Sequence, residues 1–392
     1  MFTSLLGVRL ILWMGETVPR PAPYEIMTAL SSVEVTNDSE NGDGFQIIFT
    51  LGKDKTRDYN LLQSRFLNPF SRVIIGVLLG VSPEVLIDGI ITHHQLSPSD
   101  EPGMSTLTVM GRDISMMMDL EERNEEFRNQ PDFLIVNRIL ANYAQYGLIP
   151  PFQVTPTTDV PIELQRVPRQ CETDGQFIQR LAQRNGFVFY TEPVTFGVNT
   201  AYWGPENRLG VPQPALTMNM GVYTNLISLN FANDSLAPVG TEGSFVEPIT
   251  KQRIPIPPLP SLRIPPLTSS STSARRKVQL RRSANQNPAQ AAQSAVSTVT
   301  NSPEAVRGEG ELDTVRYGNI LRARKLVGVR GAGLSYDGFY YVRSVTHSIR
   351  KGEYKQLFTL SREGTGALLP VVPVSLSPLG FAGIAAGLQV RF

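Results

Sequence analysis

Cysteine and histidine, which proteins use for disulfides, metal sites and nucleophilic catalysis, are scarce in this chain of 392 residues. Cys171 is the only cysteine, which excludes a disulfide within the chain and is compatible with a reducing compartment. His93 and His94 are neighbours, so on a strand they point to opposite faces, and His347 stands alone. We interpret all three histidines as ordinary polar strand residues and predict neither a metal nor a cofactor.

Long hydrophobic runs and a strong net charge are also absent. No stretch reaches the length of about 20 apolar residues that a membrane helix needs, and three prolines interrupt the best candidate, residues 368–390. Residues 5–14 are apolar but are broken by Gly7 and Arg9, so they predict a first strand rather than a signal peptide. The formal net charge of +1 gives the whole chain no attraction to nucleic acid or acidic lipid. We therefore predict no membrane span and no nucleic-acid specificity.

Three groupings that resemble catalytic or phosphate-binding motifs have simpler explanations. The glutamates of residues 121–126 are bunched with arginines and indicate a solvated charged face. Cys171 precedes a predicted helix, but no local Cys–His signature accompanies it. The glycines of residues 328–333 lead into an aromatic strand, whereas a dinucleotide-binding loop leads into a helix, so they predict a turn. We predict that the chain is not an enzyme.

Glycine and proline are plentiful, with 32 and 30 residues, which favours many short strands over long helices. Near the N-terminus, apolar, β-rich segments at 45–49, 73–79 and 85–92 are bounded by turn residues. Segments this apolar suggest a small sheet that is closed enough to bury both faces of some strands. We predict a small barrel or sandwich over residues 1–118.

Two helices are predicted in the middle of the chain. Apolar residues recur at spacings of three and four over residues 133–143. A second helix begins at Thr173, with Gln176 placed for a capping box, and leads into an aromatic strand. We predict a helical connection at 119–159, then a helix and strands at 160–243.

The composition changes sharply after this point. Residues 251–282 contain eight Lys or Arg, six Pro and no Asp or Glu. Such sequence buries too little apolar surface to offset chain entropy, so we predict a Pro/Arg/Ser-rich extended linker or insertion at 244–311. No aromatic residues interleave the cations, which favours a solvated linker, or one docked on an acidic partner, over a nucleic-acid site. The candidate partner-interface residues in this segment are Arg275, Arg276, Lys277, Arg281 and Arg282.

Residues 312–364 form the last predicted β module. The Asp337-Gly338 turn leads into an aromatic, β-branched strand around Tyr340, and a polar turn at 350–353 sends the chain back. This stretch resembles the C-terminal part of the phage late control D family. That family is the central baseplate hub of contractile phage tails, extracellular contractile injection systems and VgrG-type spikes. The segment CETDGQFIQRLAQRNGFVFY at 171–190 resembles the same family.

The resemblance implies an α+β, β-dominated fold with two tube-like β-barrel domains, intervening helices and a long Pro/Ser-rich linker. It assigns residues 1–118 to the first β-barrel, and residues 160–243 with 312–364 to the second. It implies a homotrimer whose six similar barrels adapt a sixfold tail tube to a threefold spike. The further partners implied are a separate spike protein, a tail tube or tube-initiator protein, and baseplate wedge or sheath-proximal proteins. Assembly is expected in the bacterial cytoplasm, and the product in a virion tail or injection-system baseplate.

VgrG-type spikes continue into a needle, whereas after residue 364 we expect only an apolar C-terminal tail at 365–392 and no fused needle. We predict that this tail is buried against a neighbouring chain. Its candidate interface residues are Phe381, Ile384, Leu388 and Phe392. Two other functions stay open at this point: a tail-associated cell-wall hydrolase, and a module that binds cargo or nucleic acid through the basic linker.

Overall fold

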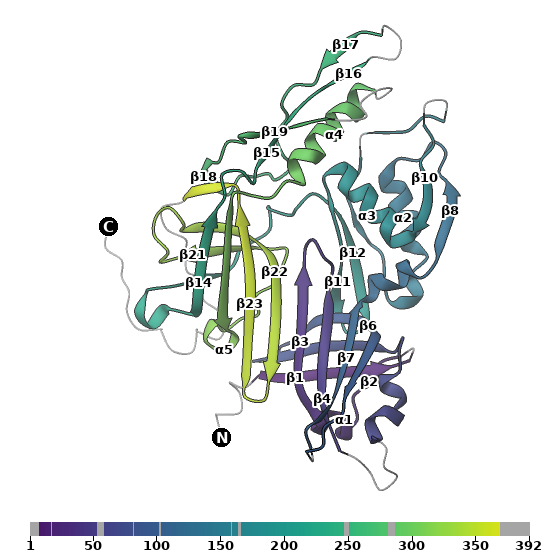
Figure 1. Cartoon of the computed structure of the whole chain (residues 1–392), viewed down its shortest axis with the longest axis vertical. Coiled ribbons are helices and arrows are strands. Elements are labelled where there is room, and N and C mark those ends of the chain that lie inside the picture. The colour runs from purple at the N-terminus through teal and green to yellow at the C-terminus, as the bar shows by residue number, and fades with distance from the viewer. Residues whose placement is uncertain are drawn as a thin grey trace.

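The computed structural model describes residues 8–16, 18–52, 59–80, 82–101, 103–157, 159–163, 166–246, 251–280 and 287–368. One sheet of 13 strands dominates it (Figure 1). Eight of these strands lie side by side in antiparallel order, and the order mixes strands from the two ends of the chain. In spatial order they are β14 (Leu226–Asn233), β20 (Val306–Asp313), β23 (Glu353–Arg362), β22 (Gly338–Arg350), β3 (Leu30–Asp38), β4 (Gly44–Leu51), β7 (Ser105–Asp113) and β6 (Ser82–Ser97).

In the N-terminal half, the sheet bends back over itself at β6. This strand pairs with β5 (Arg72–Leu79) through its first part and with β7 through its second part. β5, β1 (Val8–Gly15) and β2 (Arg20–Pro21) then cross behind β3 and β4 (Figure 1). The space between the layers is filled by apolar side chains such as Ile47 and Phe49. The short helices α1 (Tyr24–Ala29), η1 (Asn60–Gln63) and η2 (Arg65–Leu67) belong to this half.

In the C-terminal half, a second curved sheet covers its own apolar core. β21 (Leu326–Arg330) pairs with the first part of β22, and β13 (Gln213–Thr217) pairs with β21. Leu216, Tyr340 and Leu360 lie in the core. Of the turn predicted at 328–333, residues 331–333 are confirmed, because Gly331 has a φ of 82° and the chain continues into β22 rather than a helix, whereas residues 328–330 belong to β21. The helices η5 (Gly221–Tyr223) and α5 (Thr314–Tyr317) complete this half.

The β-dominated class is confirmed, whereas two closed barrels stay a prediction. Among the described residues, no ladder joins β1 or β2 to β3, or β13 to β14. Each half is therefore a curved sheet folded over a core in the part of the chain that the structure describes.

A third layer of mixed structure packs beside the N-terminal half. It comprises η3 (Ile114–Asp119), β8 (Glu122–Glu126), α2 (Asp132–Ala141), η4 (Ala144–Tyr146), β9 (Gln153–Val154), β10 (Arg169–Thr173), α3 (Asp174–Asn185), β11 (Val188–Thr195) and β12 (Val198–Gly204). The two predicted helices are confirmed as α2 and α3. Thr173 caps α3, since its hydroxyl accepts a hydrogen bond from the Gln176 backbone N–H at 3.3 Å. Gly186 ends it in the left-handed conformation, with a φ of 68°.

The helical connection predicted at 119–159 is wrong over its charged part. Residues 122–126 form the strand β8, which pairs antiparallel with β10. The outward-pointing residues of β8 are solvated, as the charge pattern predicted. The segment is nevertheless a strand, because it pairs with β10 through backbone hydrogen bonds. The pairing partner lies more than 40 residues away in the sequence, so no local pattern reveals it.

The extended linker predicted at 244–311 is also wrong in part. Residues 288–300 form the helix α4 (Pro288–Thr300), which packs against α3. Asn287 and Gln290 make a full capping box, and the small side chains of Ala291 and Ala295 are buried. The rest contains short paired strands: β15 (Val239–Glu242) with β19 (Arg276–Gln279), β16 (Ser244–Val246) with β17 (Arg253–Pro255), and β18 (Thr268–Ser271) with β24 (Gly364–Ala367). Small residues allow two helices to pack closely. A prediction that counts only large apolar residues therefore underestimates how much of this segment can be buried.

No helix within the described ranges combines the length and the apolar character that crossing a membrane requires.

Candidate functional site

The two halves of the sheet meet at a single pair of strands, β22 and β3. Seven residues of β22, from Ser344 to Arg350, pair antiparallel with Asp38 to Ser32 of β3. The hydroxyl oxygens of Thr36 and Thr346 lie 3.2 Å apart across this ladder. Because backbone hydrogen bonds run without interruption from one half to the other, the ladder fixes the angle between the two halves.

Arg324 reinforces this junction from the C-terminal half. One guanidinium nitrogen donates to the Asp43 carboxylate at 3.0 Å, and another donates to the Asp38 carbonyl oxygen at 2.6 Å. The guanidinium also lies 4.3 Å from the centre of the Tyr190 ring. Burial alone would lower the pKa of Arg324, but the Asp43 carboxylate raises it, so the guanidinium stays protonated. Arg324 therefore joins both halves and the strand β11 at one point.

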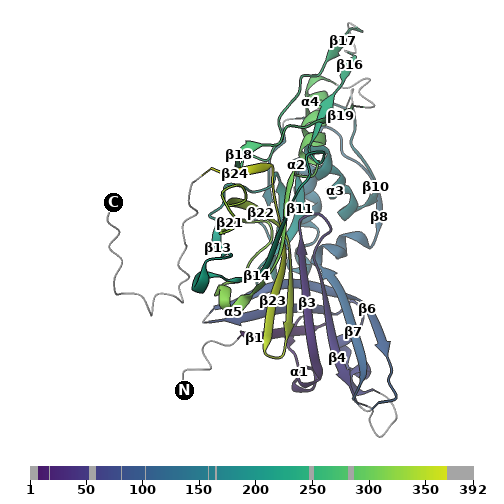
Figure 2. The same cartoon turned by 60° about the vertical axis from the view of Figure 1, so that its left-hand side comes forward.

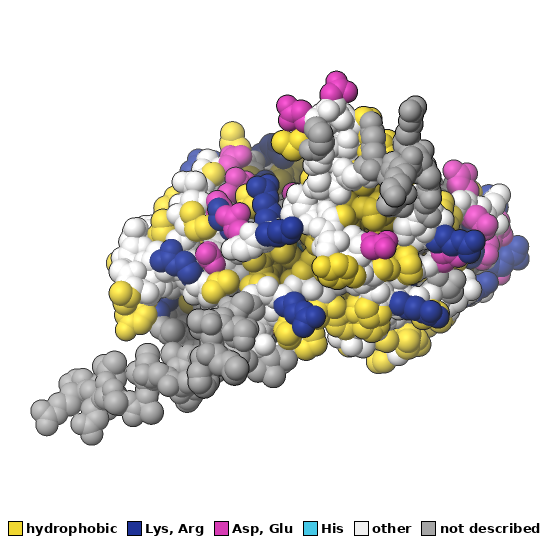
Figure 3. Space-filling view, turned by 90° about the horizontal axis from the view of Figure 1, so that it is seen from below, with side chains coloured by type: hydrophobic (Ala, Val, Ile, Leu, Met, Phe, Trp, Pro, Cys, Tyr) yellow, Lys and Arg dark blue, Asp and Glu magenta, His cyan; other side chains and the backbone are white. Residues whose placement is uncertain are grey.

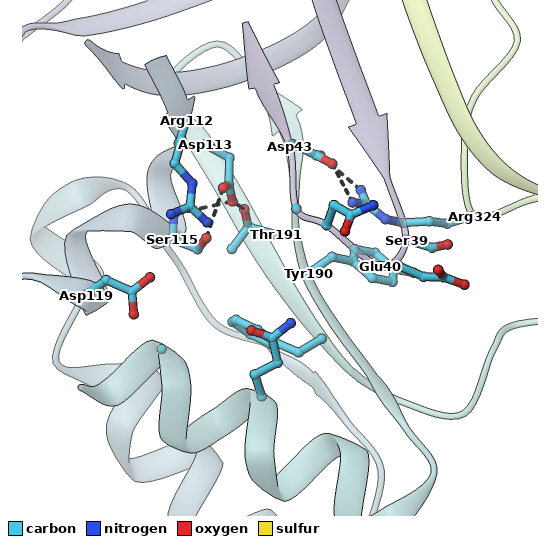
Figure 4. Close-up of a pocket in the computed structure, with 15 residues that line it drawn as sticks. Ser39, Glu40, Asp43, Arg112, Asp113, Ser115, Asp119, Tyr190, Thr191 and Arg324 are labelled. Carbon is cyan, nitrogen blue, oxygen red and sulfur yellow. Dashed lines mark hydrogen bonds and ion pairs between the residues drawn. The ribbon is translucent and has the colours of Figure 1, made fainter. Parts of the chain in front are cut away.

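Figure 4 shows a small cavity of about 60 Å³ beside this ion pair. The Asp113 carboxylate at the end of β7 accepts from the hydroxyls of Thr191 and Ser115. Burial, with the nearby Asp43 charge adding to it, raises the pKa of Asp113. Asp119 accepts from the Thr173 hydroxyl at 2.8 Å. Asp113 and Asp119 therefore each bond to hydroxyl groups of neighbouring segments, and the residues that line the cavity come from β7, β11 and α3.

Two further polar contacts connect distant segments. Arg322 donates to the Glu84 carboxylate and to the Val85 carbonyl oxygen, both at 2.7 Å, and so ties the segment before β21 to β6. Arg72 forms a buried pair with Asp88 at 2.6 Å. Asp88 also accepts from the Asn199 amide at 2.9 Å, which attaches β12 to the N-terminal half.

A buried ion network lies in the C-terminal half. Arg208, whose side chain is 0% exposed, contacts Glu304 at 2.5 Å and both Glu206 and Glu363 at 3.1 Å. Arg343 of β22 contacts Glu206 at 2.6 Å and Glu304 at 3.1 Å. Burial alone would raise the pKa of Glu304, but these arginines lower it to about 2, so the carboxylate is ionised. The network joins four segments that are far apart in the sequence.

The eight-strand part of the sheet has one open face, and this face is polar. Shallow hollows on it are lined by small polar side chains such as Ser228, Ser344 and Thr346 in the C-terminal half, and by Thr36 and Gln46 in the N-terminal half. The face runs across the junction without a break in hydrogen bonding. It offers a continuous, hydrophilic surface without a convergent set of reactive groups in the described residues.

Other surfaces are markedly apolar. Figure 3 shows hydrophobic side chains gathered in a band across the face seen from below. Large apolar side chains that are well exposed elsewhere in the described residues include Tyr24, Val222 and Leu334, at 82%, 94% and 79% exposure. Exposed apolar groups in such numbers are typical of a protein that works in contact with other chains.

The predicted partner-interface residues divide into two sets. Arg275 is exposed, and Arg276 and Lys277 are exposed on β19. The remainder lie outside the described residues: Arg281, Arg282, Phe381, Ile384, Leu388 and Phe392. Their roles stay predictions. Among the described residues, no group of three His, Cys, Asp or Glu side chains could hold a metal ion.

The sequence reasoning missed Arg324, Arg208 and Arg343. Asp43 was seen only as part of a turn. His347, predicted to be an ordinary polar strand residue, is fully buried in β22, where its Nδ1 lies 2.8 Å from the Tyr354 hydroxyl oxygen and 3.2 Å from the Gln356 amide nitrogen. The sequence does contain one signal for Arg324. Arg322 and Arg324 stand directly before an apolar strand, where the pattern indicates no solvent-exposed face for charged side chains.

Comparison with known proteins identifies solved structures that share this architecture. A family model described as the Alg8 N-terminal domain matches residues 21–211, just under half of the chain. No curated protein matches. Among solved structures, a tail protein from Neisseria meningitidis MC58 is 14% identical, with a TM-score of 0.60, and the match covers 92% of this chain and 98% of that one. The 43 kDa tail protein of prophage MuSo2 from Shewanella oneidensis is 14% identical, with a TM-score of 0.59 and coverage of 91% and 99%.

A third similar structure is the c3393 protein of E. coli, described as a component of the type VI secretion system with structural similarity to the T4 tail proteins gp27 and gp5. It is 14% identical, with a TM-score of 0.54, and the match covers 88% of this chain and 78% of that one. The chain therefore has the fold of phage tail and type VI secretion proteins, over nearly its whole length. The narrower resemblance to the late control D family stays a prediction.

Proposed function

We propose that this chain is a structural hub of a contractile-tail baseplate, in which three copies form a ring between a sixfold tail tube and a threefold spike. The fold shared with phage tail and type VI secretion proteins supports a tail-associated role. The two curved half-sheets, locked together by the β22–β3 ladder and by Arg324, support a subunit that presents two similar units at a fixed angle. Three such subunits would supply the six units that a sixfold tube requires.

The free edges of the sheet carry this proposal. Among the described residues β14 pairs with β20 on one side only, and its sequence LISLNFAN contains no proline or charge that would guard an edge strand. At the other end, β6 pairs with β7 through residues 93–97, and no ladder covers its opposite side there among the described residues. β14 and β6 run in opposite directions, since all seven intervening pairings are antiparallel. The β14 edge of one copy can therefore pair antiparallel with the β6 edge of the next.

The stagger between these edges is compatible with a closed ring. A row of directly paired residues runs across the sheet from Leu226 on β14 to Ile91 on β6. Pairing β14 with residues 92–97 of the next copy shifts the register by about seven residues across the eight strands. At the usual spacings along and between strands, this shift corresponds to a strand tilt of roughly 30°. Closed barrels have tilts of about 35–45°, so the required shift is close to ordinary barrel geometry.

In such a ring, the polar open face of the sheet would line the lumen, and the apolar surfaces would contact the spike, the tube and other baseplate proteins. In this proposal the protein acts as a structural adaptor and catalyses no reaction. The ring would assemble in the bacterial cytoplasm and work in a virion tail or an injection-system baseplate.

Mass and shape in solution test the proposal. We expect light scattering to give three times the chain mass of 43.2 kDa at high concentration, and electron microscopy to show a ring with an open centre. Lysines introduced on the edge strand by Asn230→Lys and Ala232→Lys should give monomers, because they block strand pairing. The control Thr359→Lys lies on the open face of the inner strand β23 and should leave the trimer intact. An assembly whose copy number is not a multiple of three, or one indifferent to the β14 substitutions, would refute the proposal.

A further inference from the structure

The two halves of the main sheet repeat one arrangement of five strands. In the C-terminal half the spatial order is β14-β20-β23-β22-β21, and in the N-terminal half it is β3-β4-β7-β6-β5. All pairings within each set are antiparallel, and both sets have the same order along the chain. The next strands differ, because β13 pairs parallel with β21 whereas β1 pairs antiparallel with β5. Each of the five strands in one half therefore has a counterpart in the other.

The counterparts match residue by residue, because the bulges lie at the same places. The β3–β4 and β14–β20 ladders each shift by one residue directly after their first pair, at Ser31 and at Ile227. The β6–β7 and β22–β23 ladders shift at Thr92 and at Arg343. The resulting counterparts are residues 30–38 and 226–234, residues 91–97 and 342–348, and residues 70–72 and 324–326.

The backbone repeats an uncommon conformation at the position of Arg324. Arg324 has a φ of 64° and its counterpart Phe70 has a φ of 66°, values that residues with a side chain rarely adopt. The Arg324 N–H donates to the Val342 carbonyl oxygen at 2.7 Å, and the Phe70 N–H donates to the Ile91 carbonyl oxygen at 2.8 Å. Val342 and Ile91 directly precede the two bulges, so the repeat extends beyond the ladders into the connecting segments.

A turn after the first strand of each set is repeated as well. The Asp38 carboxylate accepts a hydrogen bond from the Glu40 backbone N–H at 2.7 Å. Its counterpart Asp234 accepts one from the Leu236 backbone N–H at 2.8 Å. Both are turns that an aspartate side chain stabilises two residues along the chain. Leu236 is therefore the counterpart of Glu40.

The strands that join the halves have counterparts with open edges. β22 pairs with β21 as far as Tyr341 and with β3 from Ser344 onward. Its counterpart β6 pairs with β5 as far as Ile90, and no ladder among the described residues takes the place of β3 after the bulge. β14, the counterpart of β3, has no ladder in the place of β22 within the described ranges. Figure 2 shows β14 and β6 on opposite sides of the β22–β3 junction.

We propose that neighbouring copies join by repeating the β22–β3 ladder in the same register, so that residues 93–97 of one copy pair with residues 230–234 of the next. This inference rests on the ring of the proposed function and names the residues of its contact. The partner is a second copy of this chain, because the two open edges are the counterparts of two strands that already fit each other.

The internal register has the geometry of a barrel. A row of directly paired residues that starts at Leu226 reaches Val35, the counterpart of Phe231, so it advances from 226 to 231 across four strands. At the usual spacings along and between strands, this advance corresponds to a tilt of about 40°. This tilt is steeper than pairing β14 along its whole length would give, and it lies within the range of about 35–45° for closed barrels.

The contacts beside the ladder would change from ionic inside the chain to apolar between copies. Arg324 and Glu40 line one small cavity at the internal junction, where Arg324 binds Asp43 (Figure 4). Their counterparts are Phe70 and Leu236, which are 55% and 59% exposed in a single copy. In the repeated ladder, Phe70 of one copy and Leu236 of the next would lie together. Two exposed apolar groups would then be covered, which favours association.

A second apolar pair lies within the proposed ladder. Leu96, which is 38% exposed, would stand directly opposite the partly buried Phe231. Their counterparts His347 and Val35 are paired at the internal junction and fully buried there. The same position between copies would therefore bury Leu96 against Phe231.

Cysteine cross-linking tests the register in a Cys171→Ser chain, which has no other cysteine. Gln95→Cys and Ala232→Cys occupy the places of Thr346 and Thr36, whose hydroxyl oxygens lie 3.2 Å apart. We expect mild oxidation to give covalent trimers on a denaturing gel, because directly opposite residues have the Cα spacing that a disulfide needs. Neither substitution alone should give covalent trimers.

A shifted pair is the matched control for the register. Gln95→Cys with Ser228→Cys places the two cysteines four residues out of register, a separation of about 13 Å along the strands, so it should not cross-link. Trimers in which the shifted pair cross-links and the direct pair does not would overturn the register while the ring stands. A chain that stays monomeric at every concentration would refute both the register and the ring.

Sedimentation tests the apolar contact separately. Phe70→Asn should weaken self-association by roughly tenfold or more, and Leu236→Asn should act in the same direction. Asparagine tolerates the positive φ at position 70, and Phe70 is more than half exposed, so each copy should still fold. The control Leu334→Asn changes an apolar side chain that is 79% exposed in the turn before β22 and should have little effect. Equal association of the Phe70 and Leu334 variants would exclude this contact.

Discussion

The two halves of the main sheet share a plan but differ in what they bury. In the N-terminal half, the residues between the layers are apolar, such as Val35, Ile47 and Phe49. In the C-terminal half, the apolar core is accompanied by the network around Arg208 and Glu304, both almost fully buried. An apolar core tolerates changes of shape within limits, whereas a buried charge needs each of its partners. The fold of the N-terminal half therefore depends on how well apolar side chains fill its core. The fold of the C-terminal half depends in addition on the positions of its buried charged groups.

The largest expected effect breaks the C-terminal network. Arg208→Met should lower the free energy of unfolding by about 3–5 kcal/mol, because it leaves buried carboxylates without their cation. Urea denaturation measures the change. The control Arg307→Met removes a cation from an exposed pair with Glu309 and should stay within about 0.5 kcal/mol. Equal effects for the two substitutions would mean that the network adds nothing specific.

The next effect concerns the contact between the halves. Arg324→Met should lower the free energy of unfolding by about 3 kcal/mol, since the buried Asp43 carboxylate loses its partner. Adding Asp43→Asn should recover part of this loss, because no uncompensated charge then remains. Hydrogen exchange should show the increase in opening first in β3 and β22. Exchange that rises only in β6 would contradict this assignment of the junction.

Acid should weaken the sheet through His347. Burial, with the nearby Arg322 charge adding to it, lowers the pKa of His347 to about 3. The unfolded chain binds a proton below the ordinary pKa of 6.5 while the folded chain does not, so stability falls as the pH drops from 6.5 toward 3. The expected slope is about 1.4 kcal/mol for each pH unit in that window.

Unfolding is measured between pH 6.5 and 4.5, since the pKa of Glu304 lies below its ordinary value of 4.5. Burial also lowers the pKa of His94, so His94 adds to the slope in this window and the substitution at position 347 is needed to separate the two. In the variant His347→Asn the slope should flatten over the same interval. A wild-type slope that the substitution leaves unchanged would exclude His347 as the source.

The same comparison explains how much could be predicted from the sequence. The strands of the N-terminal half and the helices α2 and α3 follow from spacing and caps, which are local. The network does not, because Arg208 and Glu304 are 96 residues apart and come from irregular segments. The helix α4 escaped prediction because its buried face is made of alanines, and β8 because its partner strand is distant. Ion pairs between distant segments leave almost no local pattern.

The smallest expected effect concerns the β22–β3 ladder, where the two halves of the sheet meet. Thr36 and Thr346 face each other across β3 and β22, with their hydroxyl oxygens 3.2 Å apart. Thr346→Val keeps the shape but removes the hydrogen bond, so we expect a loss of about 0.5 kcal/mol, typical of a cross-strand pair. The double variant with Thr36→Val should be no less stable than the single one, since both polar groups are then gone. Strict additivity in this double-mutant cycle would show that the hydroxyl pair adds no coupling of its own between the two halves.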